Sequence, residues 1–171
     1  MRDHHAVTCQ CGKVAFGASG SPISTGVCYC GDCQVAGRRF DGFLDADGGT
    51  PAVLYRKDRV HCEAGHEHLA QFRLKPDSAT RRIVAICCNS PMLLDFTKGH
   101  WLSLYRTRFG ADAPAIEMRV MTRDRPAGVV LPNDVPSYEG FSGRFLRRLI
   151  LAWIAMGFRR PDIGLNDLPV I

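Results

Sequence analysis

The sequence predicts a mainly β domain followed by an extension that ends in one helix. Short apolar segments rich in β-branched and aromatic residues recur up to about residue 110, and turn residues separate them. Beyond that point the chain becomes proline-punctuated, and an apolar and arginine-rich segment with helical periodicity follows. These observations favour a small, mostly antiparallel β domain with a C-terminal segment wrapped around it.

The individual strands are predicted from near alternation of apolar and polar residues. Residues 8–16 are expected to form a strand with a kink at Gly12, and residues 27–30 form a second strand-like segment before a Gly31-Asp32 turn. Further strands are predicted over residues 53–55, 60–62, 69–74 and 82–87, each bounded by turn residues.

The β domain is expected to span residues 1–110, and the extension residues 111–171. Within the extension, residues 143–158 are predicted to form one helix. Ser142 is expected to cap its start, and Gly157 and Pro161 are the residues that end it. One face of this helix is apolar, because five apolar residues recur at helical spacing: Phe145, Leu149, Ala152, Trp153 and Met156. We expect this stripe to pack on the β domain or on a second copy of the chain, which would make a homodimer.

The composition excludes several classes of protein. The N-terminal residues lack the apolar stretch of a secretion signal, so a cytoplasmic, reducing location is expected for the 8 cysteines, and metal binding is favoured over disulfides. The longest apolar run, 149–158, is about half the ~20 residues of a membrane-spanning helix, so no membrane span is expected. The net charge of +5 is mild and forms no aromatic-interleaved stripe, so no nucleic-acid binding is expected.

The strongest chemical signal is the group Cys28, Cys30 and Cys33. Residues i and i+2 of a strand point to the same side, and a Gly31-Asp32 turn would fold Cys33 back towards the other two. Thiolate sulfur is the preferred structural ligand of zinc. Three thiols within six residues therefore predict a Zn²⁺ site.

The other cysteines are less closely grouped. Cys9 and Cys11 have the same i and i+2 spacing, which places two sulfurs side by side. Cys88 is the better ligand candidate of the Cys87-Cys88 pair, because turn residues follow it, whereas Cys87 is either a ligand or a core residue. Cys62 stands alone and is expected to be a half-buried strand residue.

These motifs together resemble the glutathione-dependent formaldehyde-activating enzyme family, which includes centromere protein V. The resemblance covers roughly residues 6–105, and the Cys-Cys-Asn-Ser-Pro segment is similar to that of a divergent bacterial branch. Gly65 and the strand after it also match the family pattern. The motifs that carry the resemblance are Cys9-Gln-Cys11-Gly-Lys-Val14, Cys28-Tyr-Cys30-Gly-Asp-Cys33-Gln34 and Cys88-Asn-Ser-Pro91.

The resemblance implies a β-tent fold, in which several small antiparallel sheets surround one or two zinc ions. It places Cys9, Cys11 and Cys88 in a structural site, and Cys28, Cys30 and Cys33 around a second zinc with an open fourth position. The chain departs from the family pattern where Ala85 occupies the place of a cysteine. Cys87 replaces that ligand, or the site has three ligands, or it is lost.

Three functions remain open from the sequence. The resemblance implies a carbon–sulfur lyase acting on glutathione or another small thiol or thiol adduct, with Arg38 and Arg39 as candidates for binding the substrate's carboxylates. The alternative is a non-catalytic protein-interaction module in which zinc only stabilises the fold. Metal handling or thiol redox sensing is the third.

Overall fold

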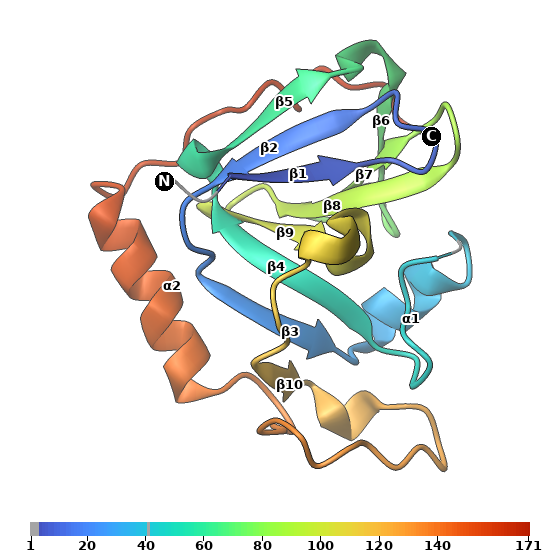
Figure 1. Cartoon of the computed structure of the whole chain (residues 1–171), viewed down its shortest axis with the longest axis vertical. Coiled ribbons are helices and arrows are strands. Elements are labelled where there is room, and N and C mark those ends of the chain that lie inside the picture. Colours follow the sequence, from blue (N-terminus) through green and yellow to red (C-terminus); the bar gives the residue numbers. More distant parts are fainter. Residues whose placement is uncertain (1–3, 41) are drawn as a thin grey trace.

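The structure, a computed structural model, describes residues 4–40 and 42–171 (Figure 1). Within these residues the strands are β1 (His4–Thr8), β2 (Ala15–Ser19), β3 (Ser24–Cys28), β4 (Thr50–Arg56), β5 (Val60–Ala64), β6 (Leu69–Phe72), β7 (Thr80–Ala85), β8 (Ser90–Phe96), β9 (Trp101–Tyr105) and β10 (Met118–Val120). The α-helices are α1 (Gly31–Gly37) and α2 (Gly143–Ala155). Short 3₁₀ helices are η1 (Lys57–Arg59), η2 (His66–His68), η3 (Arg106–Arg108), η4 (Gly110–Asp112) and η5 (Thr122–Asp124).

The strands form a three-stranded sheet, in the order β1-β2-β5, and a seven-stranded sheet, in the order β10-β3-β4-β9-β8-β7-β6. Neighbouring strands are antiparallel except for β10, which lies parallel to β3. The extension thus supplies the edge strand of the larger sheet. The predicted fold class is confirmed: the protein is a mainly β, β-tent arrangement with a C-terminal helix.

The two faces of the seven-stranded sheet have different environments. On β4, Val53 and Tyr55 belong to the main core, together with Phe16 and Val60 of the smaller sheet. The alternate residues Ala52 and Leu54 point the other way, and Leu149 of α2 packs against them. Because side chains alternate along a strand, the same division holds across the sheet. One face is filled by the core and the other is covered by helices.

Helix α2 begins as the sequence predicts. The Ser142 hydroxyl accepts a hydrogen bond from the Phe145 amide at 3.1 Å, a regular N-terminal cap, and Gly157 has a positive φ of 61° just past the helix. The helix ends at Ala155 rather than at Phe158. Leu149, Ala152 and Met156 of the predicted stripe are buried, and Leu149 packs against Ala52 and Leu54 of β4. Trp153 is half-buried and stacks on His100 at 5.4 Å.

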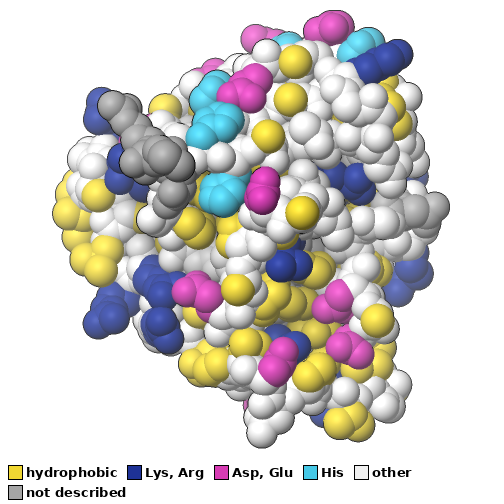
Figure 2. Space-filling view, viewed as in Figure 1, with side chains coloured by type: hydrophobic (Ala, Val, Ile, Leu, Met, Phe, Trp, Pro, Cys, Tyr) yellow, Lys and Arg dark blue, Asp and Glu magenta, His cyan; other side chains and the backbone are white. Residues whose placement is uncertain are grey.

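The outer face of α2 is apolar as well. Ile150, Leu151 and Ile154 are between 51% and 56% exposed, and Figure 2 shows apolar and basic side chains together over α2. Residues 141–160 contain five arginines and no Asp or Glu. The whole chain has 22 Lys and Arg against 17 Asp and Glu, so without this segment the two counts are equal, at 17 each. The entire excess of positive charge therefore lies on and beside α2.

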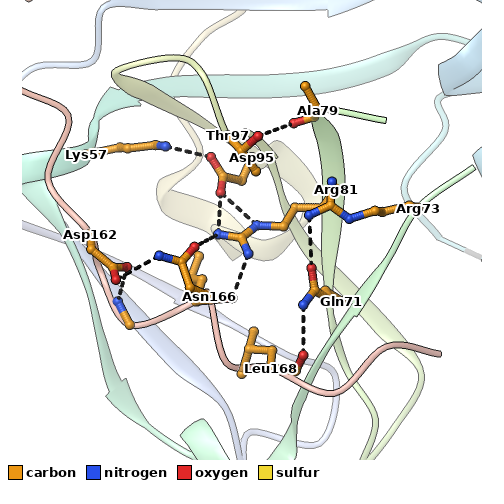
Figure 3. Close-up of polar contacts among 12 residues, drawn as sticks. Lys57, Gln71, Arg73, Ala79, Arg81, Asp95, Thr97, Asp162, Asn166 and Leu168 are labelled. Atoms are coloured by element: carbon orange, nitrogen blue, oxygen red, sulfur yellow. Dashed lines mark hydrogen bonds and ion pairs between the residues drawn. The ribbon is translucent and has the colours of Figure 1, made fainter. Parts of the chain in front are cut away.

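The last residues of the chain return to the seven-stranded sheet. The buried Asp95 carboxylate accepts a hydrogen bond from Arg81 at 2.9 Å and pairs with Lys57 at 2.8 Å (Figure 3). Arg81 also donates to the Leu165 carbonyl at 2.8 Å and to the Asn166 side chain at 3.0 Å. These bonds satisfy the buried charges and attach the C-terminal segment to β7 and β8.

Three strand predictions need correction, all of them beside cysteines. Residues 9–14 form the turn of a hairpin between β1 and β2 rather than a kinked strand, because Cys9 donates its amide to the Val14 carbonyl and Gly12 has a positive φ of 76°. β3 ends at Cys28, not at residue 30, because α1 begins directly afterwards. β7 ends at Ala85, so Cys87 lies in a turn rather than in a strand.

No helix within the described residues is long and apolar enough to cross a membrane. A boundary between two units near residue 110 stays a prediction.

Candidate metal centres and an adjoining cavity

Four cysteines converge at one end of the three-stranded sheet. The sulfur of Cys87 lies 3.4 Å from that of Cys11 and 3.9 Å from those of Cys9 and Cys88. The Sγ atoms of all four cysteines lie within 4.8 Å of one another. Zinc–sulfur bonds of about 2.3 Å in a tetrahedron require sulfurs about 3.8 Å apart. The four side chains therefore fit the ligand set of one tetrahedral ion.

The first two of these cysteines are positioned by the β1–β2 turn. The Val14 amide donates to the Cys9 sulfur at 3.3 Å, which fixes this side chain within the turn. The left-handed Gly12 turns the chain back, so both sulfurs face the same point. The side-by-side placement expected for Cys9 and Cys11 is present, although a turn produces it and not the alternation of a strand.

The second pair comes from the turn between β7 and β8. Ala85 is buried in the core, and the turn that follows carries Cys87 and Cys88, with Asn89 in the left-handed region at a φ of 52°. The Ser90 hydroxyl lies 3.0 Å from the Cys88 sulfur and accepts a bond from the Gln10 amide at 3.2 Å. Adjacent residues of a turn can face one way, so both sulfurs reach the cluster.

Burial disfavours ionisation of the Cys88 thiol. Hydrogen bonds from Ser90 and Cys11 outweigh that effect and lower the pKa of Cys88 to about 6. One thiolate is thus favoured in this cluster before any metal binds.

The second cluster contains Cys28, Cys30 and Cys33, whose sulfurs also lie within 4.8 Å of one another. Cys28 is the last residue of β3, Cys30 caps α1, and Cys33 lies on the first turn of that helix. The predicted turn at Gly31-Asp32 is therefore the start of a helix. The helix has the same effect as the predicted turn, because residues three apart on a helix share a face.

Within this cluster the Cys30 thiolate is the favoured anion. Hydrogen bonds from Cys28 and Cys33 lower the pKa of Cys30 well below its usual range, and the charge of Arg82 adds to the effect. Hydrogen bonds with Cys30 and Cys33, together with burial, raise the pKa of Cys28. Three thiolates around one Zn²⁺ carry a net charge of −1, which a neighbouring cation would balance.

Arg82 supplies that cation. Its side chain is 1% exposed, and among the described residues it has no carboxylate partner. One guanidinium nitrogen donates to the Asp32 carbonyl at 3.1 Å, while the Nε–H has no hydrogen-bond partner. Buried arginines are normally paired. An unpaired guanidinium beside three cysteines therefore indicates an anionic group at this site.

The second of these clusters lines a cavity. A cavity of about 390 Å³ lies on the helix-covered face of the seven-stranded sheet, and Cys28, Cys30 and Cys33 line it together with Thr50, Arg82 and Tyr105. The cysteines of the first cluster are not among its lining residues. Burial raises the pKa of Tyr105, which keeps its hydroxyl protonated as a donor beside Arg82.

The candidate substrate arginines lie farther away. Arg38 and Arg39 are exposed just after α1, about 8 Å along the helix direction from Cys33, and neither lines the cavity. Arg39 lies over the Phe72 ring at 4.6 Å. Cys62 is half-buried on β5, as expected, and belongs to neither cluster.

Sequence reasoning missed Arg82, Tyr105 and Thr50. The signal that could have found the first is an arginine pair at the start of a strand that is otherwise apolar, Arg81 to Ile86. The sequence analysis also missed a third group of residues of the kind that can bind metals, His4, His61 and Glu63. His4 and His61 lie 2.9 and 3.2 Å from the Glu63 carboxylate on the exposed side of the smaller sheet. The two histidines thus share one carboxylate oxygen as their partner.

The model of one protein family, described as glutathione-dependent formaldehyde-activating enzyme, matches residues 4–112, which is 109 of the 171 residues. The chain belongs to this family. Its family-matched region holds all eight cysteines, whereas β10 and α2 lie beyond it. The sequence resemblance is thus confirmed over a slightly longer range than expected.

No curated protein matches the chain significantly. Among solved structures, a crystal structure of a Rhodobacter sphaeroides protein is similar, with 14% identity and a TM-score of 0.49. The similarity covers 77% of the chain described here and 98% of the Rhodobacter sphaeroides protein.

Proposed function

We propose that this protein is a zinc-dependent carbon–sulfur lyase that acts on glutathione or other small thiol adducts. One observation carries the proposal: three cysteines, and not four, line a cavity. Structural zinc sites are closed by four protein ligands, whereas catalytic sites keep one position for water or substrate. The four-cysteine cluster fits the closed type, and the three-cysteine cluster fits the open type.

Cys28, Cys30 and Cys33 would hold the ion of the open site, and Cys9, Cys11, Cys87 and Cys88 that of the closed site. When bound at the open site, zinc supplies a Lewis acid that holds a thiolate sulfur or a hydroxyl oxygen. Two zinc ions per chain are thus proposed. A cytoplasmic location goes with the proposal, because the cysteines must remain reduced.

The proposed reaction breaks the carbon–sulfur bond of a hydroxyalkyl thioether. The hydroxyl group is on the carbon that is bonded to sulfur. The bonding electrons leave with sulfur, the hydroxyl proton passes through solvent to that sulfur, and the carbon becomes an aldehyde, so the products are a thiol and an aldehyde. No oxidant is required. The Tyr105 hydroxyl and the Arg82 Nε–H lie in the same cavity wall as the cysteines, so they would donate hydrogen bonds to the oxygen or sulfur that becomes negative.

Arg38 and Arg39 are proposed to bind carboxylates of the thiol outside the cavity. Their exposure after α1 supports a contact with the part of a substrate that remains in solvent. Replacing both with glutamine should raise the KM for glutathione adducts and leave the KM for an uncharged thiol adduct unchanged.

The proposal is tested by comparing Cys30→Ser with Cys11→Ser. Cys30→Ser should lose one zinc and all turnover of the formaldehyde–glutathione adduct, with little change in melting temperature. Cys11→Ser should lower the melting temperature more, because its cluster joins segments 76 residues apart and its loss opens that long loop. The readouts are zinc content, melting curves and adduct turnover on the same preparations.

A Cys30→Ser protein that keeps two zinc ions would contradict the assignment of the open site. Wild-type protein that binds two zinc ions but neither binds nor turns over any thiol adduct would favour the alternative, a zinc-stabilised interaction module.

A further inference from the structure

The cavity beside Cys28, Cys30 and Cys33 is much larger than a one-carbon group requires. Its volume is about 390 Å³, whereas space for a single water takes about 10–15 Å³ by the same kind of measure. We propose that this cavity binds an apolar chain or ring, so that the substrate class is a thiol adduct of a bulky apolar aldehyde or thiol. This inference rests on the proposed function for the nature of the reacting group.

The floor of the cavity is one face of the seven-stranded sheet. Every second residue of its strands faces the space, as the alternation of a strand requires. Near the cysteines this face is polar, with Thr50, Arg82 and Tyr105. Farther along the same strands it becomes apolar, with Leu54, Leu94, Phe96 and Trp101.

The opposite wall comes from the extension. It is apolar, and Phe141, Phe145, Leu146 and Leu149 line it, while Met118 and Val120 of β10 line the adjoining edge of the floor. All of them lie beyond residue 112, where the match to the family ends. The apolar wall is therefore added by this chain's own C-terminal segment.

Charge decides what this space can bury. The charged residues among those that line it are Asp32 and Arg82. Glutathione carries two carboxylates and one ammonium group, and each would need a partner if removed from water. One unpaired guanidinium cannot serve them all. A peptide thiol would therefore leave its charged part outside, and an apolar group would fill the inner space.

The polar and apolar ends of the cavity determine how a ligand would lie in it. The cysteines and Arg82 form the polar end of a cavity whose remaining walls are mainly apolar, with the hydroxyl groups of Ser24, Thr80 and Ser103 among them. A ligand with one sulfur or oxygen and a long apolar chain would place its polar atom at the cysteines and its chain between β4 and α2. Burial of the chain would bring about a threefold gain in affinity per methylene.

The experiment measures the binding of ethanethiol, butanethiol and octanethiol to the zinc-loaded full chain by calorimetry. Affinity should rise several hundredfold from two to eight carbons, at roughly threefold per methylene. Ser103→Leu, which puts a larger side chain into the cavity floor, and Phe145→Ala, which removes part of the wall, should each lower octanethiol affinity at least tenfold and leave ethanethiol nearly unchanged. Ile150→Ala, on the outer face of α2, is the matched control and should change neither.

Equal affinities for ethanethiol and octanethiol would overturn the inference. So would a chain-length dependence that neither cavity variant alters, because binding would then occur elsewhere. Octan-1-ol and butan-1-ol binding to Cys30→Ser protein separates this inference from the proposed function. Preference for octan-1-ol there supports the apolar cavity even if no zinc chemistry exists, and the absence of that preference counts against it.

Discussion

The sulfur of Cys87 lies 3.4 Å from the sulfur of Cys11, although the two residues are 76 positions apart. Ala85, in the place where the family has a cysteine, is buried in the core and has no part in this contact. The turn after β7 thus brings Cys87, two residues later, within reach of the sulfurs of Cys9, Cys11 and Cys88.

Replacing Cys87 with serine should remove one zinc ion and lower the melting temperature by about 10 °C, which corresponds to roughly 3 kcal/mol for a chain of this size. The physical reason is that the metal joins two distant turns only when all its ligands are present. Zinc analysis and melting curves measure both effects. Cys62→Ser is the control, since that thiol lies outside both clusters, and it should keep two zinc ions. Unchanged zinc content in Cys87→Ser would show a three-ligand or absent site.

Gly65 is predicted to be intolerant of any side chain. Its φ is 76°, and a Cβ atom there would lie 2.2 Å from the Lys13 carbonyl, in the turn that carries Cys9 and Cys11. Gly65→Ala should cost roughly 3 kcal/mol or prevent soluble expression, because the backbone of the cluster must move.

Gly128→Ala isolates the conformational part of this cost. Gly128 has a similar φ of 82° with nothing within 4 Å of the added atom, so its substitution should cost about 1 kcal/mol. Urea unfolding measures both variants. Equal losses would show that the contact with Lys13 relaxes freely.

The ion pair between Arg148 of α2 and Glu117 predicts a pH dependence of stability. Hydrogen bonding by Arg148 lowers the pKa of Glu117 below its ordinary value of 4.5, and the two groups are only part-buried. A lowered pKa in the folded state contributes stability above the ordinary value, and that stability is lost as the pH falls through the folded-state pKa. Glu117→Gln should therefore cost about 0.5–1 kcal/mol at pH 7 and almost nothing near pH 3.

Melting curves of wild type and Glu117→Gln at both pH values check this. Glu139→Gln, at an exposed carboxylate, is the control and should melt with the wild type at pH 7. A difference for Glu117→Gln that persists at low pH would mean that the pair contributes through packing and not through charge.

The outer face of α2 is predicted to mediate self-association. Ile150 and Ile154 are more than half exposed and lie four residues apart on one side of the helix. Changing both to aspartate should shift the protein to monomer in sedimentation velocity experiments, whereas Val130→Asp, at an 89% exposed site elsewhere, should not. Wild-type protein that is monomeric at all concentrations would exclude the homodimer. If such a monomer co-sediments with anionic lipid vesicles, the basic apolar face is a membrane-surface contact instead.

The sequence predicted the metal clusters better than the backbone around them. Three cysteines within six residues indicate a shared metal site. Cys28, Cys30 and Cys33 could therefore be grouped whether a turn or a helix joins them. The near alternation of Cys9, Cys11 and Val14 indicated a strand, but a hairpin turn gives the same spacing. The role of Cys87 depends on whether the strand ends at Ala85 or continues to Cys87. Local propensity does not decide between these two ends.

The cavity could not be predicted at all. Arg82, Tyr105 and Thr50 come from three strands, and which side each faces depends on pairing across the whole sheet. The apolar wall of the cavity depends further on where α2 packs. The apolar stripe predicts which face of the helix is buried, but it does not predict which strands that face contacts. The docking of Leu149 on Ala52 and Leu54 is settled only by the tertiary structure.

The family-matched residues hold the cysteines, and the extension holds the apolar wall. Substitutions in β10 or α2 can therefore reshape the pocket without touching a ligand or the turns that carry it. Relatives that share the cysteine pattern but differ after residue 112 are expected to act on different molecules, and swapping this tail between them offers a direct route to exchanging their preferences.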